Sequence, residues 1–349
     1  MQLEVHEGFS VYKNGYGPVF VALHSGPTTD ILSGRDSYSD MIASFCFERN
    51  GGTLILANIT RNRVYGIDFN REIPDLDVAL DMYSKFLKNS STDLCHQYKR
   101  KYSFVAENKK DYQEKVRIYK KFWSYIRTSG DFIIFIHTLI SRLKNFSSII
   151  DLITFNSRGI DKHILNKIIG EVNEANAKFF KRIESDYKQV ILLEQKRIVN
   201  SISIDKINLE KDMKIADQWC YKKIDSKSSL VLQKNKDYLD FLQNRKINLN
   251  DRNTKRILLK IFKYVLKNAP TPKITLENIY NAETAIGPIK EIVKNGRKIA
   301  IEVEINSFIS RWYPEETVKI IIDIINKIKQ VDEYKKLGFS QTQILKFFA

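Results

Sequence analysis

The sequence has few cysteines and no long apolar run, and each shortage excludes a class of protein. Its 349 residues include only 3 cysteines. Cys46, Cys95 and Cys220 lie far apart, so they fit neither a disulfide framework nor a paired-cysteine metal motif. This usage is typical of a reducing compartment, and we expect a cytoplasmic protein.

The longest apolar stretch, Phe132 to Ile140, contains His137 and is far shorter than the roughly 20 residues of a membrane-spanning helix. The first six residues, Met1 to His6, do not show a basic region followed by an apolar one. We therefore expect neither an export signal nor a membrane partner.

The chain is basic, with a net charge of +16, although its apolar fraction of 43% is that of a soluble globular protein. A basic protein can bind nucleic acid or lipid head groups. The other explanation is a general compositional bias, because the sequence is rich in lysine and isoleucine. The net charge alone favours this second explanation over a nucleic-acid or lipid partner. Residues 166–270 hold 23 Lys and Arg against 13 Asp and Glu, so nucleic-acid binding, if present, would use this segment.

Buried strands and amphipathic helices alternate along both ends of the sequence. Short apolar runs are typical of strands covered on both faces, and apolar residues three or four apart indicate helices. The predicted strands are Pro18–Leu23, Thr53–Ile59, Val64–Phe69, Phe132–Ile136, Ile149–Phe155 and Lys298–Asn306, and the predicted helices include Leu76–Leu87, Asp111–Tyr125 and Thr317–Ile328. This order predicts an α/β fold with a mixed, largely parallel central sheet covered by helices.

The predicted α/β pattern is interrupted by a lysine-rich, helical stretch that is almost free of glycine. It ends near Pro270-Thr271-Pro272, after which the strand pattern returns. We therefore predict a discontinuous catalytic domain, residues 1–165 and 271–349, with residues 166–270 as a basic helical insertion.

Two predicted strands end in histidines, His24 and His137, and Asp36 follows the first of them. Carboxyl ends of parallel strands meet at one edge of a sheet, and two histidines with one carboxylate and an open position make a catalytic zinc site. Such a site also needs a general base and a cation for an anionic substrate. Glu302 and Glu304 share one face of a late strand, and the candidate cations are Arg63, Arg71 and Arg158.

The order of these motifs resembles that of the N-formylglutamate amidohydrolase family, which is related to succinylglutamate desuccinylase, aspartoacylase and the zinc carboxypeptidases. The resemblance covers roughly residues 18–160 and 270–310, and five segments carry it: His24-Ser25-Gly26; Arg35-Asp36; Arg63 with Asp68-Phe69-Asn70-Arg71; Gly130 to His137-Thr138; and Glu302-Val303-Glu304-Ile305-Asn306. It implies a zinc-carboxypeptidase-like (phosphorylase/hydrolase-like) fold.

The resemblance also implies roles for individual residues. His24, Asp36 and His137 would hold one Zn²⁺ per chain, and Glu304 would activate the attacking water. Arg71, helped by Asn70, would bind the carboxylate of a small anionic substrate whose amide bond is hydrolysed. The sequence departs from the family at Phe135, where the family usually has an aspartate before the second histidine.

Each site residue also has a structural interpretation. Histidines at strand ends often only donate hydrogen bonds, and Asp36 precedes a predicted helix that it could cap. Glu302 and Glu304 could form the polar face of an exposed edge strand. Arg63 and Arg71 could form surface salt bridges of little energetic weight.

Two other functions stay open at this point. One is a carboxypeptidase-like metallopeptidase, which needs a cleft open to a peptide chain. The other is a non-catalytic protein that binds nucleic acid or another polyanion on a degenerate hydrolase scaffold. The sequence does not predict the oligomeric state.

Overall fold

The structure, a computed structural model, describes residues 1–27, 36–155, 160–200, 256, 259–260, 262–263, 266–267, 269–280, 287–294, 298–336 and 340–347. Within them lies an eight-stranded sheet with the order β1-β2-β4-β3-β5-β8-β6-β7. The strands are β1 (Gln2–His6), β2 (Phe9–Asn14), β3 (Val19–Ala22), β4 (Gly52–Ala57), β5 (Phe132–Leu139), β6 (Ser148–Ile153), β7 (Lys273–Leu276) and β8 (Ile299–Asn306).

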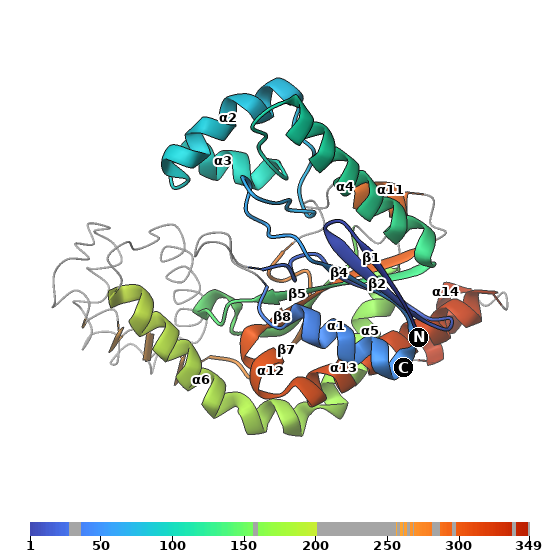
Figure 1. Cartoon of the computed structure of the whole chain (residues 1–349). Coiled ribbons are helices and arrows are strands. Elements are labelled where there is room, and N and C mark those ends of the chain that lie inside the picture. Colours follow the sequence, from blue (N-terminus) through green and yellow to red (C-terminus); the bar gives the residue numbers. More distant parts are fainter. Residues whose placement is uncertain are drawn as a thin grey trace. The chain divides into compact units, whose positions relative to one another are not determined.

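Helices connect the strands (Figure 1). They are α1 (Ser39–Asn50), α2 (Leu76–Asn89), α3 (Asp93–Lys101), α4 (Lys109–Ser129), α5 (Lys162–Ala175), α6 (Ala177–Asn200), α11 (Gly287–Val293), α12 (Ser307–Trp312), α13 (Pro314–Lys336) and α14 (Gln341–Phe347), with a short 3-10 helix, η1 (Leu143–Asn145). Among the described residues, no helix combines the length and apolar character needed to cross a bilayer.

The chain forms two compact units. The first comprises Met1–Leu139, Ile150–Val172 and Thr275–Ala349, and the second comprises Ile140–Ile149 and Asn173–Ile274. In the second unit the rings of Phe146 and Tyr187 stack with centroids 4.8 Å apart. Residues 201–250 lie outside the described part of the chain, so the predicted insertion at 166–270 and the domain boundaries stay predictions.

The centre of the sheet is parallel. β3 runs parallel to β4 and β5, and β5 runs parallel to β8, whereas β2 and β6 join this group in antiparallel fashion. The prediction of an α/β fold with a mixed sheet is therefore confirmed. The carboxyl ends of β3, β4, β5 and β8 lie at one edge, which is where α/β folds place ligand sites.

Both faces of the parallel strands are buried, as their apolar runs predict. On one face, α4 packs Phe122 and Trp123 into a core that includes Val21 and Phe135. On the other face, α1 contacts β3, β4 and β5 and also packs against α13. This layering holds the strand ends rigidly, so the loops after them can position polar side chains.

The predicted strand at Val64–Phe69 is wrong, because this segment is an irregular turn. Backbone hydrogen bonds connect it to the residues just before it. Ile67 N donates to Thr60 O at 2.9 Å, and Gly66 N donates to Asn62 O at 2.9 Å. A Cβ on Gly66 would lie 1.8 Å from Thr60 O, so only glycine allows this close approach. The turn directs Ile67 and Phe69 into the core beside α4, where the rings of Phe69 and Phe122 stack with centroids 4.0 Å apart.

A buried lysine on α4, Lys115, stabilises this turn. Its ammonium donates to Val64 O at 2.7 Å, to Val105 O at 2.9 Å and to the Asp111 carboxylate at 3.0 Å. Burial lowers the pKa of Lys115, although Asp111 opposes this effect. A single side chain thus connects α4 to two loop segments.

We expect Lys115→Met to lower the free energy of unfolding by about 2–3 kcal/mol, because two carbonyls and a carboxylate lose their donor. Urea denaturation at neutral pH measures the loss. Lys120→Met, an exposed position on the same helix, is the control and should change stability by less than about 0.5 kcal/mol. Equal midpoints for the two variants would contradict a structural role for Lys115.

Candidate functional site

The sheet brings the predicted site residues from distant parts of the sequence to one edge. His24 follows the end of β3, and His137 and Glu304 lie near the ends of β5 and β8. His137 and Glu304 are directly paired in the parallel register of these two strands, so their side chains leave the sheet on the same face. All three residues are at most 7% exposed.

A close backbone approach sets the direction of the loop that carries His24. A Cβ on Gly26 would lie only 2.0 Å from Ile59 O, so the His-Ser-Gly turn needs glycine here. The Ser25 hydroxyl donates to Ala22 O at 2.9 Å and Ala57 O at 2.7 Å. These contacts hold the turn against the end of β4.

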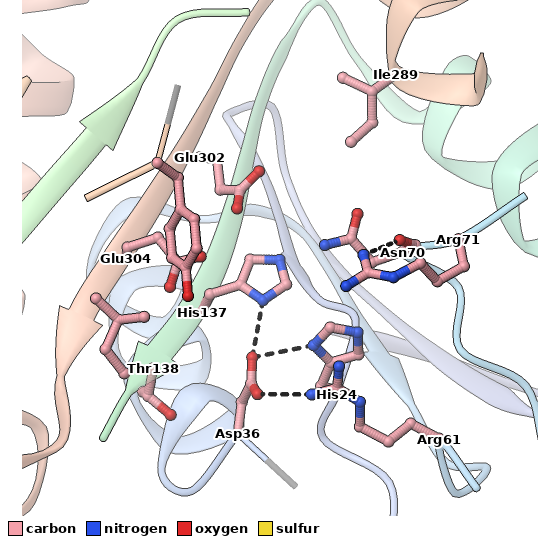
Figure 2. Close-up of a pocket in the computed structure, with 12 residues that line it drawn as sticks. His24, Asp36, Arg61, Asn70, Arg71, His137, Thr138, Ile289, Glu302 and Glu304 are labelled. Carbon is pink, nitrogen blue, oxygen red and sulfur yellow. Dashed lines mark hydrogen bonds and ion pairs between the residues drawn. The ribbon is translucent and has the colours of Figure 1, made fainter. Parts of the chain in front are cut away.

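Asp36 lies between the two histidines. Its Oδ2 lies 3.0 Å from His24 Nδ1 and 2.8 Å from His137 Nδ1 (Figure 2). The alternative that Asp36 caps α1 is wrong, because the helix starts at Ser39 and Tyr38 precedes it without a side-chain cap. The carboxylate is instead directed towards the histidines.

His24, Asp36 and His137 could bind a metal ion, since each offers a ligand atom within 4.8 Å of the others. Two imidazole nitrogens and one carboxylate oxygen are a donor set that suits a catalytic zinc ion. The other ring nitrogen of His137, Nε2, is buried and has no hydrogen-bond partner within the described residues. The residues present therefore fit a metal.

The electrostatics of this cluster favour a charged carboxylate. Burial opposes ionisation of Asp36, but the charges and hydrogen bonds of His24 and His137 outweigh it and hold the pKa of Asp36 well below its usual range. Burial likewise favours neutral His137, but the bond to Asp36 and the nearby Glu302 and Glu304 raise the pKa of His137 to about 9. Asp36 and protonated His137 therefore form an ion pair at 2.8 Å, and a metal ion that bound here would take the place of the His137 proton.

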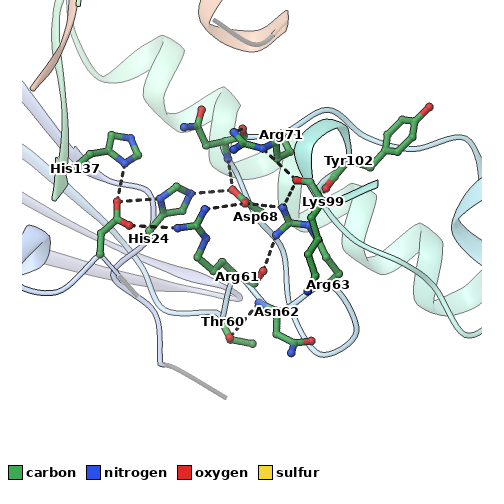
Figure 3. Close-up of polar contacts among 12 residues, drawn as sticks. His24, Thr60, Arg61, Asn62, Arg63, Asp68, Arg71, Lys99, Tyr102 and His137 are labelled. Atoms are coloured by element: carbon green, nitrogen blue, oxygen red, sulfur yellow. Dashed lines mark hydrogen bonds and ion pairs between the residues drawn. The ribbon is translucent and has the colours of Figure 1, made fainter. Parts of the chain in front are cut away.

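Asp68 fixes the orientation of His24 from the side opposite Asp36. Its Oδ1 lies 2.8 Å from His24 Nε2 and accepts the backbone N–H of Asn70 at 3.0 Å (Figure 3). A carboxylate on the second nitrogen of a metal-binding histidine sets its tautomer and leaves the first nitrogen free for the ion. This role of Asp68 could not be predicted from the sequence, although the residue lies within the Asp-Phe-Asn-Arg segment.

Asp68 forms ion pairs with two arginines, Arg61 and Arg63, and only Arg61 lines the pocket. Arg63 is buried, with an ion pair to Asp68 at 2.8 Å and bonds to Lys99 O and Tyr102 O of 2.7 and 2.8 Å. Arg61 lies at the pocket and bridges Asp36 and Asp68, each at 3.3 Å. The structure thus places Arg61, not Arg63, where a ligand could contact a guanidinium.

Asn70 and Arg71 line the same pocket. Arg71 Nε donates to Lys99 O at 3.3 Å and its Nη1 donates to Asn70 O, whereas Nη2 has no partner within the described residues. The Tyr119 hydroxyl donates to Arg71 O at 2.7 Å and supports the backbone from α4. Arg71 is therefore held in place with one nitrogen available to an anion.

These side chains surround one cavity of about 210 Å³. Its lining consists of His24, Asp36, Arg61, Asn70, Arg71, His137, Thr138, Leu139, Tyr280, Ile289, Glu302 and Glu304. Burial raises the pKa of Glu304 well above its usual value; nearby His137 opposes this, and Glu302 and Asp36 add to it. A carboxyl group with a raised pKa in a cleft is typical of a general acid or base.

Tyr280 reaches the pocket on a segment that a buried aspartate holds. Asp151 accepts the hydroxyl of Thr275 at 2.6 Å and the N–H groups of Asn278 and Ile279 at 3.1 and 2.8 Å. Asp151 pairs with Glu304 in the β6–β8 register. The role of Asp151 could not be predicted from the sequence, because its hydrogen bonds join positions more than 120 residues apart.

Two further positions complete the comparison with the sequence. Arg158 lies outside the described residues, so its predicted role in substrate binding stays untested. Phe135, where the family usually has an aspartate, is buried beside Trp123 and Phe155 with ring centroids 5.9 and 6.2 Å away. It belongs to the core.

Comparisons with known proteins give no family for this chain. No protein-family model matches, and no curated protein matches. Among solved structures, the chain is similar to the gene product Atu2144 from Agrobacterium tumefaciens, with 11% identity and a TM-score of 0.47 over 94% of this chain and 97% of that one.

Proposed function

We propose that this protein is a zinc-dependent amidohydrolase that resembles the N-formylglutamate amidohydrolase family. It would hydrolyse an amide bond in a small substrate that carries a carboxylate. The observation that supports this most directly is the convergence of His24, Asp36 and His137 beside Glu304 in one pocket. The parallel strands that carry these residues also suit a zinc-carboxypeptidase-like fold.

A bound zinc ion would polarise the scissile carbonyl and lower the pKa of a water molecule. Glu304 takes a proton from the attacking water and delivers it to the leaving nitrogen. A bound cation would also lower the pKa of Glu304 towards the range in which it accepts protons at neutral pH. The glutamate therefore serves first as a base and then as an acid.

The opposite side of the pocket binds the substrate. Arg71 donates from Nη2 to the substrate carboxylate, and Asn70 beside it can donate a further hydrogen bond. Arg61, which pairs with Asp36 and Asp68, adds a second guanidinium to this side of the pocket. Asp68 holds His24 by its Nε2, so Nδ1 would be the nitrogen that binds a metal.

We expect metal analysis of the purified protein to find about one zinc ion per chain, as a site with three protein ligands and one open position would hold. Loss of a residue that hydrogen-bonds a metal ligand weakens metal binding roughly 10- to 100-fold. His24→Ala removes a proposed ligand itself, so it should weaken zinc binding by more than this. Chelator competition measures the affinity. His163→Ala, an exposed histidine on α5, is the matched control and should retain full zinc content.

Activity is tested separately, by incubating the zinc-loaded protein with N-formyl and N-acetyl amino acids and measuring the released amino acid. Release that His24→Ala abolishes and His163→Ala preserves supports the proposal. Zinc content that is the same in the wild type and His24→Ala would contradict the assigned metal site.

A further inference from the structure

The proposed chemistry leaves one charged residue of the pocket without a role. Glu302 lies two positions before Glu304 on β8, so both side chains project from the same face of the sheet. Glu302 is only 9% exposed and lines the pocket. Within the described residues, no lysine or arginine forms an ion pair with Glu302, whereas Arg61 pairs with Asp36 and Asp68.

We propose that Glu302 selects a substrate that carries a cationic group in addition to its carboxylate. The inference rests on the proposed function and names its substrate class, an N-acyl derivative of a basic amino acid. Two carboxyl groups on one buried wall offer oxygen acceptors for charge-assisted hydrogen bonds to a cationic group. The groups facing Glu302 are Glu304 and His137, and its neighbour across the strands is Phe135.

The pocket has two walls of opposite charge. Figure 2 shows Glu302 and Glu304 beside His137, with Asn70 and Arg71 across from them. A ligand with a carboxylate at one end and an ammonium or guanidinium group at the other would match both walls. A glutamate-type substrate would instead place its second carboxylate near Glu302, where like charges repel.

The remaining lining suits the aliphatic stem of a basic side chain. Leu139 and Ile289 contribute apolar surface to the cavity, and Tyr280 contributes an aromatic ring. A volume of about 210 Å³ fits a single amino-acid derivative. Lysine and arginine stems bury their methylene groups against such surfaces while the charged end binds a carboxylate.

A competing role for Glu302 is to accept a hydrogen bond from the buried Nε2 of His137 and so support metal binding. The two roles predict different results. A residue that supports the metal would affect every substrate and the zinc affinity alike. A residue that selects a cationic group would affect only ligands that carry one.

The test measures binding calorimetrically with the purified protein and three product-like ligands: L-lysine, L-norleucine and L-glutamate. These share the α-amino and α-carboxylate groups and differ in the end of the side chain. We expect lysine to bind about 10- to 100-fold more tightly than norleucine, because a hydrogen bond between charged groups contributes that much affinity. Glutamate should bind most weakly. Glu302→Gln should remove the preference for lysine over norleucine while zinc affinity stays unchanged.

Two results would overturn the inference. One is a preference for glutamate, and the other is a Glu302→Gln variant that loses zinc and weakens all three ligands equally. The matched control is Glu291→Gln, the same change at an exposed carboxylate on α11. If lysine is preferred but no N-acyl amino acid is hydrolysed, the proposed amidohydrolase function fails while the inference about Glu302 holds.

Discussion

Replacement of Glu304 by glutamine is expected to lower kcat of the zinc-loaded protein roughly 10²- to 10⁴-fold, the range for loss of a positioned general base. Glutamine keeps the shape of the side chain and cannot take a proton from water. Because His24, Asp36 and His137 are unchanged, zinc content and the unfolding midpoint should stay close to those of the wild type. Initial rates and metal analysis of the same preparation measure both quantities.

Glu304→Gln distinguishes a general base at this position from a metal ligand. If Glu304 held the metal, its replacement would release zinc and lower activity together, and the assigned role would be wrong. If activity persisted with zinc bound, the proton transfer would have to use another group, and Glu302 would be the nearest carboxylate. Glu291→Gln, at an exposed position, should leave kcat unchanged and excludes a general effect of losing one negative charge.

The strand-end residues of the site could be predicted from the sequence. An apolar run covered on both faces has to be an interior strand, and parallel interior strands end at one edge of the sheet. His24 and His137 were therefore expected at the same edge, and they meet there because β3 and β5 are neighbours in the sheet. Glu304 followed from the same rule, and the alternative that it lies on an exposed edge strand is wrong, since β8 lies between β5 and β6.

The loop residues of the site could not be predicted in the same way. Arg61 and Arg63 are two positions apart in one turn, and only the path of that turn decides which guanidinium reaches the pocket. The apolar spacing of residues 64–69 suggested a strand, whereas Gly66 and Lys115 close the segment into a turn. Asp36 was ambiguous between a helix cap and a ligand until its distances to both histidines were known.

The role of Asp68 cannot be predicted from the sequence, because its partners come from separate loops and its neighbours in sequence do not indicate them. It is fully buried and contacts three charged or titratable side chains: His24, Arg61 and Arg63. Burial opposes its ionisation, but the two arginines and the histidine outweigh this and hold the pKa of Asp68 well below its usual range. One carboxylate thus neutralises a buried arginine and orients the imidazole of His24.

We therefore expect Asp68→Asn to lower the free energy of unfolding by about 3–5 kcal/mol at neutral pH, the cost of leaving a buried charge without its partner. The same change should weaken zinc binding about 10- to 100-fold, because His24 loses the acceptor that sets its tautomer. Asp81→Asn, an exposed aspartate on α2, is the control, and its stability should change by less than about 0.5 kcal/mol. Denaturant unfolding and chelator competition measure the two effects independently.

The pH dependence of this difference follows from the direction of the pKa shift. The pKa of Asp68 is lower in the folded protein than in the unfolded chain, where it is about 3.9. The ionised carboxylate therefore stabilises the fold fully above that value, and the contribution is lost as the pH falls below it. The difference in stability between the wild type and Asp68→Asn should be constant near neutral pH and shrink below about pH 4. A difference that grew on acidification would mean that Asp68 is protonated in the folded protein, and its pairing with Arg61 and Arg63 would not then explain its burial.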